Sequence, residues 1–287
     1  MRKPVVRKAP VRKKSTSKKK TSFWKGARGS FVLGFLFTLF LFGVAYHYRN
    51  GLAYYFSFKS DKIANNKEEK RLSDVRNFQL LSKYEHKVAG LDISQYQGNI
   101  NWSAVRVLEN TFPIGFVFIR ATVGKDKVDS EFEDNWLGAK NNKIIRGAYH
   151  YYRPNENSLE QAEIFIKNVT LQKGDLPPVL DIEKLPKNQS IDSLKVGLKR
   201  WLEKVYAHYK VKPIIYTGEN YYNEFLKDEF TEYTFWIANY NFFVEDIKDD
   251  WLFWQFTEKA TVSGINGNVD VSIYNGSPKM LRYLTKN

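Results

Sequence analysis

Two carboxylates stand one residue apart in the segment PPVLDIEKLP, residues 177–186. The apolar residues before them predict a short buried strand, and side chains at i and i+2 of a strand point to the same face. Asp181 and Glu183 should therefore lie side by side, with Cα atoms ~6.6 Å apart at ~3.3 Å per residue. Like charges this close raise one another's pKa, so one acid can donate a proton while the other carries negative charge. A solvated strand end with two ordinary acids is the alternative on this stretch alone.

Short apolar segments that predict strands recur along the second part of the chain, at 88–94, 115–122, 145–152, 177–183, 213–218, 234–240, 251–257 and 268–274. Helices are predicted between them, at 101–110, 131–142, 158–168, 190–209 and 219–227. The spacing of the first five strands is typical of βα units, whereas the last three lie too close together for full helices. The pattern predicts an α/β fold, a modified and incomplete (β/α)8 TIM-like barrel. A Rossmann-type sheet is the alternative, but no glycine-rich phosphate turn follows the first strand.

In such a barrel the C-terminal strand ends meet at one mouth, where active sites lie. Four acids are predicted there as candidate catalytic residues: Asp92, Asp181, Glu183 and Asp270. Aromatic and amide side chains at the same ends are predicted to form a substrate-binding wall: Tyr149, Tyr151, Tyr216, Trp236, Trp254 and Gln255. Rings of this kind stack on the C–H faces of sugars, whose hydroxyls bond to polar groups. For any single ring, core packing is the alternative.

The net charge of +14 comes from one end of the 287-residue chain. Residues 1–28 hold twelve Lys or Arg and no acid, which leaves 33 bases against 31 acids in the remainder. The folded part is therefore nearly neutral, and we expect no nucleic-acid partner. Without cysteine there is neither a disulfide nor a thiolate site. The histidines show no HExxH or other metal spacing, so no metal or cofactor is expected.

Residues 29–48 form a stretch without Asp, Glu, Lys or Arg. A helix of this length spans ~30 Å, the thickness of a bilayer's hydrocarbon core. The stretch predicts a transmembrane helix in the lipid bilayer, with the basic flank cytoplasmic and the later residues across the membrane. A cleaved signal peptide is the competing interpretation, but the basic region is long and no small-x-small site follows. A buried core helix is disfavoured because the stretch is apolar all round.

These patterns predict that the chain is divided into five parts. They are a basic cytoplasmic tail at 1–28, the transmembrane helix at 29–48, a polar stalk at 49–87, the barrel at 88–276 and a C-terminal tail at 277–287. The chain is thus expected to be a single-pass membrane protein whose barrel is periplasmic or extracellular, and whose basic tail contacts anionic lipid. The oligomeric state is left open.

Eight short motifs occur in the same order as in one known protein family, which they resemble. They are AGLDISQYQGNINW, FVFIRATVGKDKVDSEF, IRGAYHYYRP, PPVLDIE, PIIYTG, FWIANY, FWQFT and NVDVSIYNG. Together they are similar to the glycoside hydrolase family 25 lysozymes, the Chalaropsis-type N-acetylmuramidases, over roughly residues 88–276. The resemblance implies a modified barrel that hydrolyses the β-1,4 bond between N-acetylmuramic acid and N-acetylglucosamine in peptidoglycan. It places the general acid at Glu183 and the other family acids at Asp181, Asp92 and Asp270.

Two other functions fit part of the pattern. A non-catalytic peptidoglycan-binding protein would keep the same acidic, aromatic groove, but the general acid Glu183 is present. A family 18 chitinase also ends a strand in D-x-E, yet its longer D-x-x-D-x-D-x-E motif is absent. Whether hydrolysis retains or inverts configuration depends on the carboxylate separation in space, which the sequence does not fix.

Two further residues receive non-catalytic interpretations. His150 is expected to pack and to form hydrogen bonds near the barrel mouth. Asp129 belongs to a run of charged residues with Glu131, Glu133 and Asp134, which we interpret as the solvent-exposed start of a helix.

Overall fold

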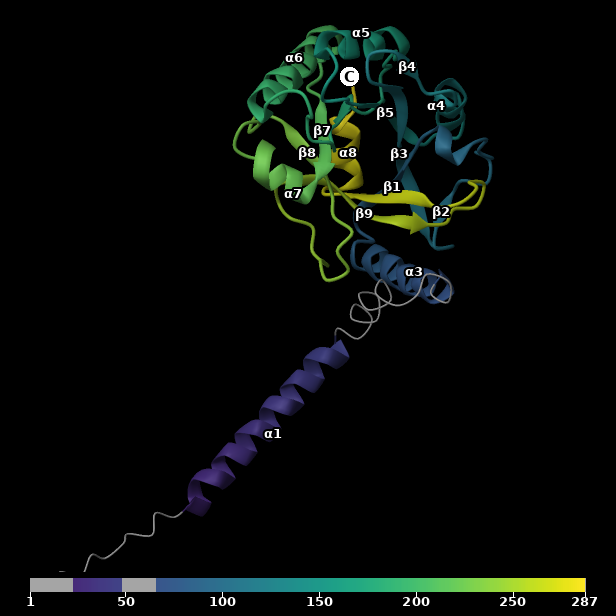
Figure 1. Ribbon diagram of the computed structural model, residues 1–287. Coiled ribbons are helices and arrows are strands. Elements are labelled where there is room, and N and C mark those ends of the chain that lie inside the picture. The colour runs from purple at the N-terminus through teal and green to yellow at the C-terminus, as the bar shows by residue number, and fades with distance from the viewer. Residues whose placement is uncertain (1–22, 48–65, 287) are drawn as a thin grey trace, which may run out of the picture. The chain divides into compact units, whose positions relative to one another are not determined.

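The computed structural model describes residues 23–47 and 66–286, which belong to two compact units (Figure 1). The first unit contains helix α1 (Phe23–His47), whose side chains from Leu33 to Val44 include many exposed apolar groups. Within the described residues, no helix combines the length and apolarity needed to cross a membrane. The predicted transmembrane helix at 29–48 is therefore not confirmed. Most of the predicted basic tail and the first part of the predicted stalk lie outside the described residues.

The second unit is built on a barrel closed by eight of the described strands. They are β1 (Val88–Ile93), β3 (Phe112–Val123), β5 (Ile145–Tyr151), β6 (Val179–Asp181), β7 (Ile214–Gly218), β8 (Thr234–Ala238), β9 (Trp251–Ala260) and β10 (Val269–Tyr274). Strand β1 pairs with both β3 and β10, which joins the two edges of the sheet. Strand β10 runs antiparallel to both of its neighbours, and the other barrel pairs are parallel. The predicted α/β barrel is confirmed.

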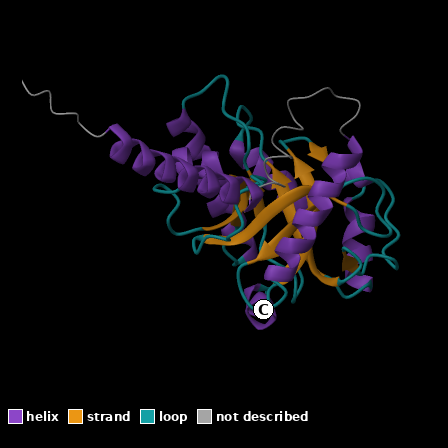
Figure 2. Ribbon diagram, turned by 90° about the horizontal axis from the view of Figure 1, so that it is seen from below, coloured by secondary structure: helices purple, strands orange, loops and turns teal. Residues whose placement is uncertain are grey.

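Helices cover the barrel where full crossovers connect the strands, and Figure 2 shows the strands at the centre of this unit. They are α4 (Phe132–Asn141), α5 (Ser158–Asn168), α6 (Ile191–Tyr209) and α7 (Glu219–Tyr221), which continues as the π-helical turn η2 (Tyr222–Leu226). Side chains that precede the helices cap two of them: Asn157 accepts from the first turn of α5 and Ser190 from that of α6. The described residues between β8 and β9, 239–250, form no helix, as the close strand spacing predicted.

The predicted helix at 101–110 is wrong. Its residues form turns and the short strand β2 (Val107–Leu108), which pairs with the start of β3. Glu109 and Asn110 take left-handed φ values of 47° and 57°, which end any helix and turn the chain back toward β3. Trp102, Val105 and Leu108 are buried in the core, and their three-residue spacing resembles that of one face of a helix.

Side chains along each strand alternate between the inside and the outside of the barrel, so the core has two layers. Inward-facing rings fill the barrel, where Phe118 stacks on Trp236 at 4.7 Å between ring centroids and meets Phe253 edge-on at 5.3 Å. Outward-facing residues such as Val117 and Ile119 pack under the helices. Helix α8 (Pro278–Leu284) adds Leu281 to the inner cluster, so part of the segment expected to be a C-terminal tail is packed against the barrel.

Helix α3 (Asn66–Lys83) lies within the segment expected to be a polar stalk. Its Leu80 and Leu81 are buried in the outer core layer. Just after the helix, the ring of Tyr84 meets that of Trp254 on β9 edge-on, with centroids 6.4 Å apart. This part of the segment is therefore packed on the barrel.

The inner layer predicts a large cost for losing one ring. Phe118→Ala should lower the free energy of unfolding by about 3–5 kcal/mol, because a fully buried ring leaves a cavity that its neighbours cannot fill. Urea unfolding followed by tryptophan fluorescence measures this loss. Leu137→Ala, at an exposed position on α4, is the control and should stay within about 0.5 kcal/mol of wild type. Equal losses in the two variants would contradict the packing described.

Candidate active site

The strand register brings the four predicted acids around one cavity. Asp92 on β1 lies directly opposite Asp270 on β10, and Asp181 ends β6 beside Tyr216 of β7. Glu183 follows two residues later, at the rim. The cavity measures about 180 Å³, and all four acids line it. Inward-pointing strand residues thus supply the acids, as alternation along each strand requires.

Asp92 and Asp270 form a hydrogen-bonded pair of carboxyls that differ in acidity. Burial, then the charge of Asp270, raises the pKa of Asp92 well above its usual range, and a hydrogen bond from Gln255 opposes this. Burial also raises the pKa of Asp270 to about 6, against a lowering by its hydrogen bond to Asp92. Asp92 therefore keeps its proton when Asp270 ionises.

Asp181 and Glu183 also hold their protons more strongly than free acids. Burial first, and then the charge of Glu183, raises the pKa of Asp181 well above its usual range, while Arg120 lowers it. Partial burial raises the pKa of Glu183, opposed by the Lys184 charge and by hydrogen bonds to Tyr151 and Tyr216. Desolvation is thus the larger cause, where the sequence pointed to mutual repulsion. Among the described residues, no group forms a hydrogen bond with Oδ1 of the buried Asp181.

Four of the predicted aromatic side chains line the same cavity: Tyr149, Tyr151, Tyr216 and Trp236. Trp236 is almost fully buried, and its Nε1 donates to Ser272 Oγ at 3.0 Å, which fixes the ring. Gln255 does not line the cavity but supports it from behind. Its Nε2 donates to Asp92 Oδ2 at 2.8 Å, and its Oε1 accepts from Tyr216 OH at 2.7 Å.

The structure does not bring Trp254 to the site. It is adjacent to the inward-facing Gln255 on β9 and therefore faces outward. There it is fully buried, packs against Tyr84 and donates from Nε1 to Asn239 O at 3.0 Å. Its predicted place in the sugar-binding wall is wrong, and its role is core packing.

His150 also faces outward, between β5 and the helices. Its ring stacks on Trp201 with centroids 5.5 Å apart, and its nitrogens contact Thr122 Oγ1 and Gln161 Oε1. Burial lowers its pKa to about 3, so the ring is neutral at physiological pH. The packing and hydrogen bonds expected for it are present, but away from the catalytic cavity.

An ion pair beside the cavity was missed from the sequence. Arg120 Nε donates to Asp129 Oδ2 at 2.8 Å, and the Asp129 side chain is fully buried. The guanidinium also lies 4.7 Å from the ring centroid of Tyr96, which lines the cavity as well. The solvated position expected for Asp129 is therefore wrong. Strand alternation places Arg120 on the inward face with Phe116 and Phe118, but it gives no signal for the partner Asp129.

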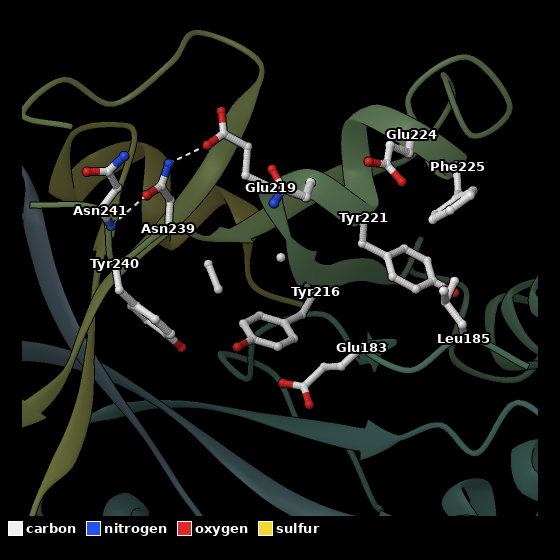
Figure 3. A pocket seen from close by; sticks show the side chains of 13 residues that line it. Glu183, Leu185, Tyr216, Glu219, Tyr221, Glu224, Phe225, Asn239, Tyr240 and Asn241 are labelled. Carbon is white, nitrogen blue, oxygen red and sulfur yellow. Dashed lines mark hydrogen bonds between the residues drawn. The ribbon is translucent and has the colours of Figure 1, made fainter. Parts of the chain in front are cut away.

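A second, larger hollow of about 650 Å³ shares Glu183 and Tyr216 with the catalytic cavity. Asn239, Tyr240 and Asn241 form one side, and Leu185, Tyr221, Glu224 and Phe225 lie opposite (Figure 3). We call this hollow the groove. Tyr240 was not predicted, although its hydroxyl donates to Gln255 Oε1 beside the Tyr216 hydroxyl. Acids at the end of an aromatic groove are suited to acid-assisted cleavage of a carbohydrate chain.

No metal site accompanies these acids. Within the described part of the chain, no three His, Asp or Glu side chains are placed to hold a metal ion.

A barrel with buried acids at its mouth is suited to an enzyme that cleaves carbohydrates, and comparison with known proteins identifies the family. The model of the glycosyl hydrolases family 25 matches residues 91–265. The chain belongs to this family and is a glycoside hydrolase, which confirms the resemblance found in the sequence.

Two relatives and one solved structure cover most of the same part of the chain. "Uncharacterized protein YegX" of Escherichia coli K12 is 35% identical over 212 residues, which cover 72% of this chain and 77% of that protein. "Lysozyme M1" of Streptomyces globisporus is 34% identical over 215 residues, 70% of this chain and 72% of that protein. A solved family 25 glycosyl hydrolase from Bacillus anthracis superposes with a TM-score of 0.62 at 29% identity, covering 70% of this chain and 94% of that one.

The raised pKa of Asp270 predicts a pH-dependent cost to stability. Between its ordinary value of 3.8 and about 6, the folded protein binds more protons than the unfolded chain, so stability falls as the pH rises through this window. Asp270→Asn removes this titration. The free energy of unfolding of wild type should fall between about pH 4 and pH 7. That of Asp270→Asn should fall by about 1–3 kcal/mol less over the same range.

Urea unfolding at the two pH values measures the difference. Asp249→Asn, at an exposed position in the loop before β9, is the matched control and should follow wild type. An Asp270→Asn curve parallel to that of wild type would contradict the burial of this carboxyl.

Proposed function

We propose that this glycoside hydrolase is a muramidase that cleaves the β-1,4 bond between N-acetylmuramic acid and N-acetylglucosamine in peptidoglycan. The observation that carries the proposal is the set of four carboxyls around one small cavity that opens into a groove. Similar proteins support the substrate class. Besides Lysozyme M1, the "N,O-diacetylmuramidase" of a Chalaropsis species is 30% identical over 150 residues, 47% of this chain and 68% of that protein.

Glu183 is the general acid in this mechanism. It lies at the rim, where the cavity and the groove meet, so a glycosidic oxygen that crosses between them comes within its reach. Partial burial raises its pKa, which keeps a fraction of the carboxyl protonated at higher pH than for a free acid. Hydrogen bonds to Tyr151 and Tyr216 hold the carboxyl in place, and the Tyr151 hydroxyl can stabilise the carboxylate left after proton transfer.

Asp181 orients the 2-acetamido group of the sugar next to the scissile bond. Its Oδ1 is buried and has no hydrogen-bond partner among the described residues, so an acetamido N–H fits this acceptor. Held in this way, the acetamido carbonyl can attack the anomeric carbon as the leaving oxygen takes the Glu183 proton. The hydrogen-bonded pair of Asp92 and Asp270 lines the same cavity and would polarise the acetamido group or the incoming water.

The first prediction concerns the general acid. Glu183→Gln should lower the turnover of purified peptidoglycan by at least about a hundredfold, because the amide cannot protonate the leaving oxygen. Muropeptide analysis by mass spectrometry should find products with reducing muramic acid ends in the wild-type digest. The matched control is Glu203→Gln, at an exposed position on α6, which should release the same products at the wild-type rate.

Near-normal turnover by Glu183→Gln would contradict its role as general acid. Failure of folded wild-type protein to release fragments from several peptidoglycan chemistries would instead indicate a binding protein that uses the same groove.

We also propose that residues 29–48 anchor the enzyme in a membrane, with the basic N-terminus cytoplasmic and the barrel on the other side. The absence of charge from this stretch, the basic residues before it and the exposed apolar side chains of α1 support the anchor. Such a chain would act on peptidoglycan close to its own membrane.

A charge test addresses the anchor. Replacing Leu36 and Phe40 by Lys places two charges in the apolar stretch, each costing about 2.5–3.5 kcal/mol at a bilayer centre, and should move the protein to the carbonate-extractable fraction. Replacing the same two residues by Ala is the control and should leave the protein in the membrane pellet. Extraction of wild type by carbonate would contradict the anchor.

A further inference from the structure

The β8–β9 loop, residues 239–250, forms one side of the groove but has no helix of its own. Elsewhere in the barrel, full crossover helices such as α5 and α6 pack on the outside of the sheet. At this position α3 packs on the outer face of β9 instead. It precedes β1 in the chain and lies outside residues 91–265, the part that matches the family model. The support of this loop thus comes from a helix that lies outside the matched segment of the chain.

Arg76 on α3 makes the central contacts with the loop. Its Nη1 donates to Phe256 O on β9 at 2.6 Å, and its Nη2 donates to Asn241 O at 2.9 Å and to Val244 O at 3.3 Å. The guanidinium is buried and lies 5.7 Å from the ring centroid of Phe242. The planar guanidinium reaches these carbonyls from two separate nitrogens, whereas the three N–H groups of a lysine ammonium share one nitrogen.

A second set of contacts holds the far half of the loop. Tyr84 OH donates to Glu245 O at 3.2 Å and accepts from Ile247 N at 3.0 Å. Lys83 Nζ pairs with Asp246 Oδ1 at 2.6 Å, at an exposed position. Residues 241–247 of the loop are therefore held by α3 and by Tyr84, which follows it.

The loop carries its wall residues directly beside these contacts. Asn241, whose carbonyl Arg76 holds, follows Tyr240, and both side chains line the groove (Figure 3). The Tyr240 hydroxyl donates to Gln255, and Gln255 donates to Asp92 in the catalytic cavity. Hydrogen bonds and a peptide bond thus connect α3 with the groove wall at Tyr240 and, through Gln255, with the carboxyl of Asp92.

We propose that Arg76 is a positioning residue for the substrate. Through the β8–β9 loop it sets the wall of the groove that receives the glycan chain, and α3 takes the structural role of the missing crossover helix. Arg76 touches neither substrate nor catalytic acid, so its effect falls on binding. The identity of the substrate rests on the proposed function, whereas the positioning of the loop does not.

Kinetics of the full chain on soluble peptidoglycan fragments tests the proposal. Arg76→Ala and Arg76→Lys should raise KM roughly tenfold, because small displacements of a positioning element are costly. The pH dependence of kcat should be unchanged, since the carboxyls of the cavity are retained. Arg71→Ala, an exposed arginine on the same helix, is the matched control and should keep the wild-type KM. Tyr84→Phe removes the contacts of the Tyr84 hydroxyl with the loop while keeping the ring, and should give a smaller rise in KM.

Hydrogen–deuterium exchange tests the same proposal without substrate. Residues 239–250 should exchange faster in Arg76→Lys and Tyr84→Phe than in Arg71→Ala, with the barrel strands unchanged. A lowered melting temperature with wild-type KM and wild-type loop exchange would overturn the proposal, because Arg76 would then serve stability alone. If wild type fails to cleave peptidoglycan, the proposed function fails, and loop exchange still decides whether α3 positions the groove wall.

Discussion

The pairing of β1 with both β3 and β10 is the constraint on which the remaining structure depends. It closes the sheet, and because β10 runs antiparallel to its neighbours, it sets Asp270 opposite Asp92. Closure also removes water from the interior, which is filled by rings such as Phe118 and Trp236. The acids at the mouth are consequently desolvated, and desolvation is the largest cause of the raised pKa of each one. The chemistry of the site thus follows from how the barrel closes.

Buried acids destabilise a fold unless other groups compensate, and this barrel supplies several. Gln255 connects Asp92 with the hydroxyls of Tyr216 and Tyr240, so one amide holds a carboxyl and two groove residues. The Arg120–Asp129 ion pair places a positive charge beside Asp181 and lowers its pKa. Asp181 Oδ1 alone remains unsatisfied within the described site, which is the atom that the proposed mechanism assigns to the substrate.

Much of the fold could be predicted because strand alternation and strand spacing are local signals. All eight barrel strands lie where the sequence places them, and alternation correctly points Asp92, Asp181 and Asp270 to one face. Alternation also means that Trp254 and Gln255 cannot both face the barrel interior, but the strand register is needed to decide which of the two does. The partner of Asp129 is nine residues away on the other side of a turn, and α3 contacts a loop more than 160 residues later. Tertiary contacts of this kind leave no local pattern in the sequence. Trp102, Val105 and Leu108 have the spacing of one face of a helix, although they do not form one.

The most direct test of the proposed mechanism is a crystal structure of the Glu183→Gln variant bound to a glycan tetrasaccharide of alternating N-acetylmuramic acid and N-acetylglucosamine. We expect an acetamido group in the cavity of Asp92, Asp181 and Asp270, with its N–H bonded to Asp181 Oδ1. We also expect the scissile oxygen within hydrogen-bond distance of residue 183 and the chain continuing past Tyr240. A glycan that binds in the groove with its acetamido groups in solvent, away from Asp181, would contradict the mechanism.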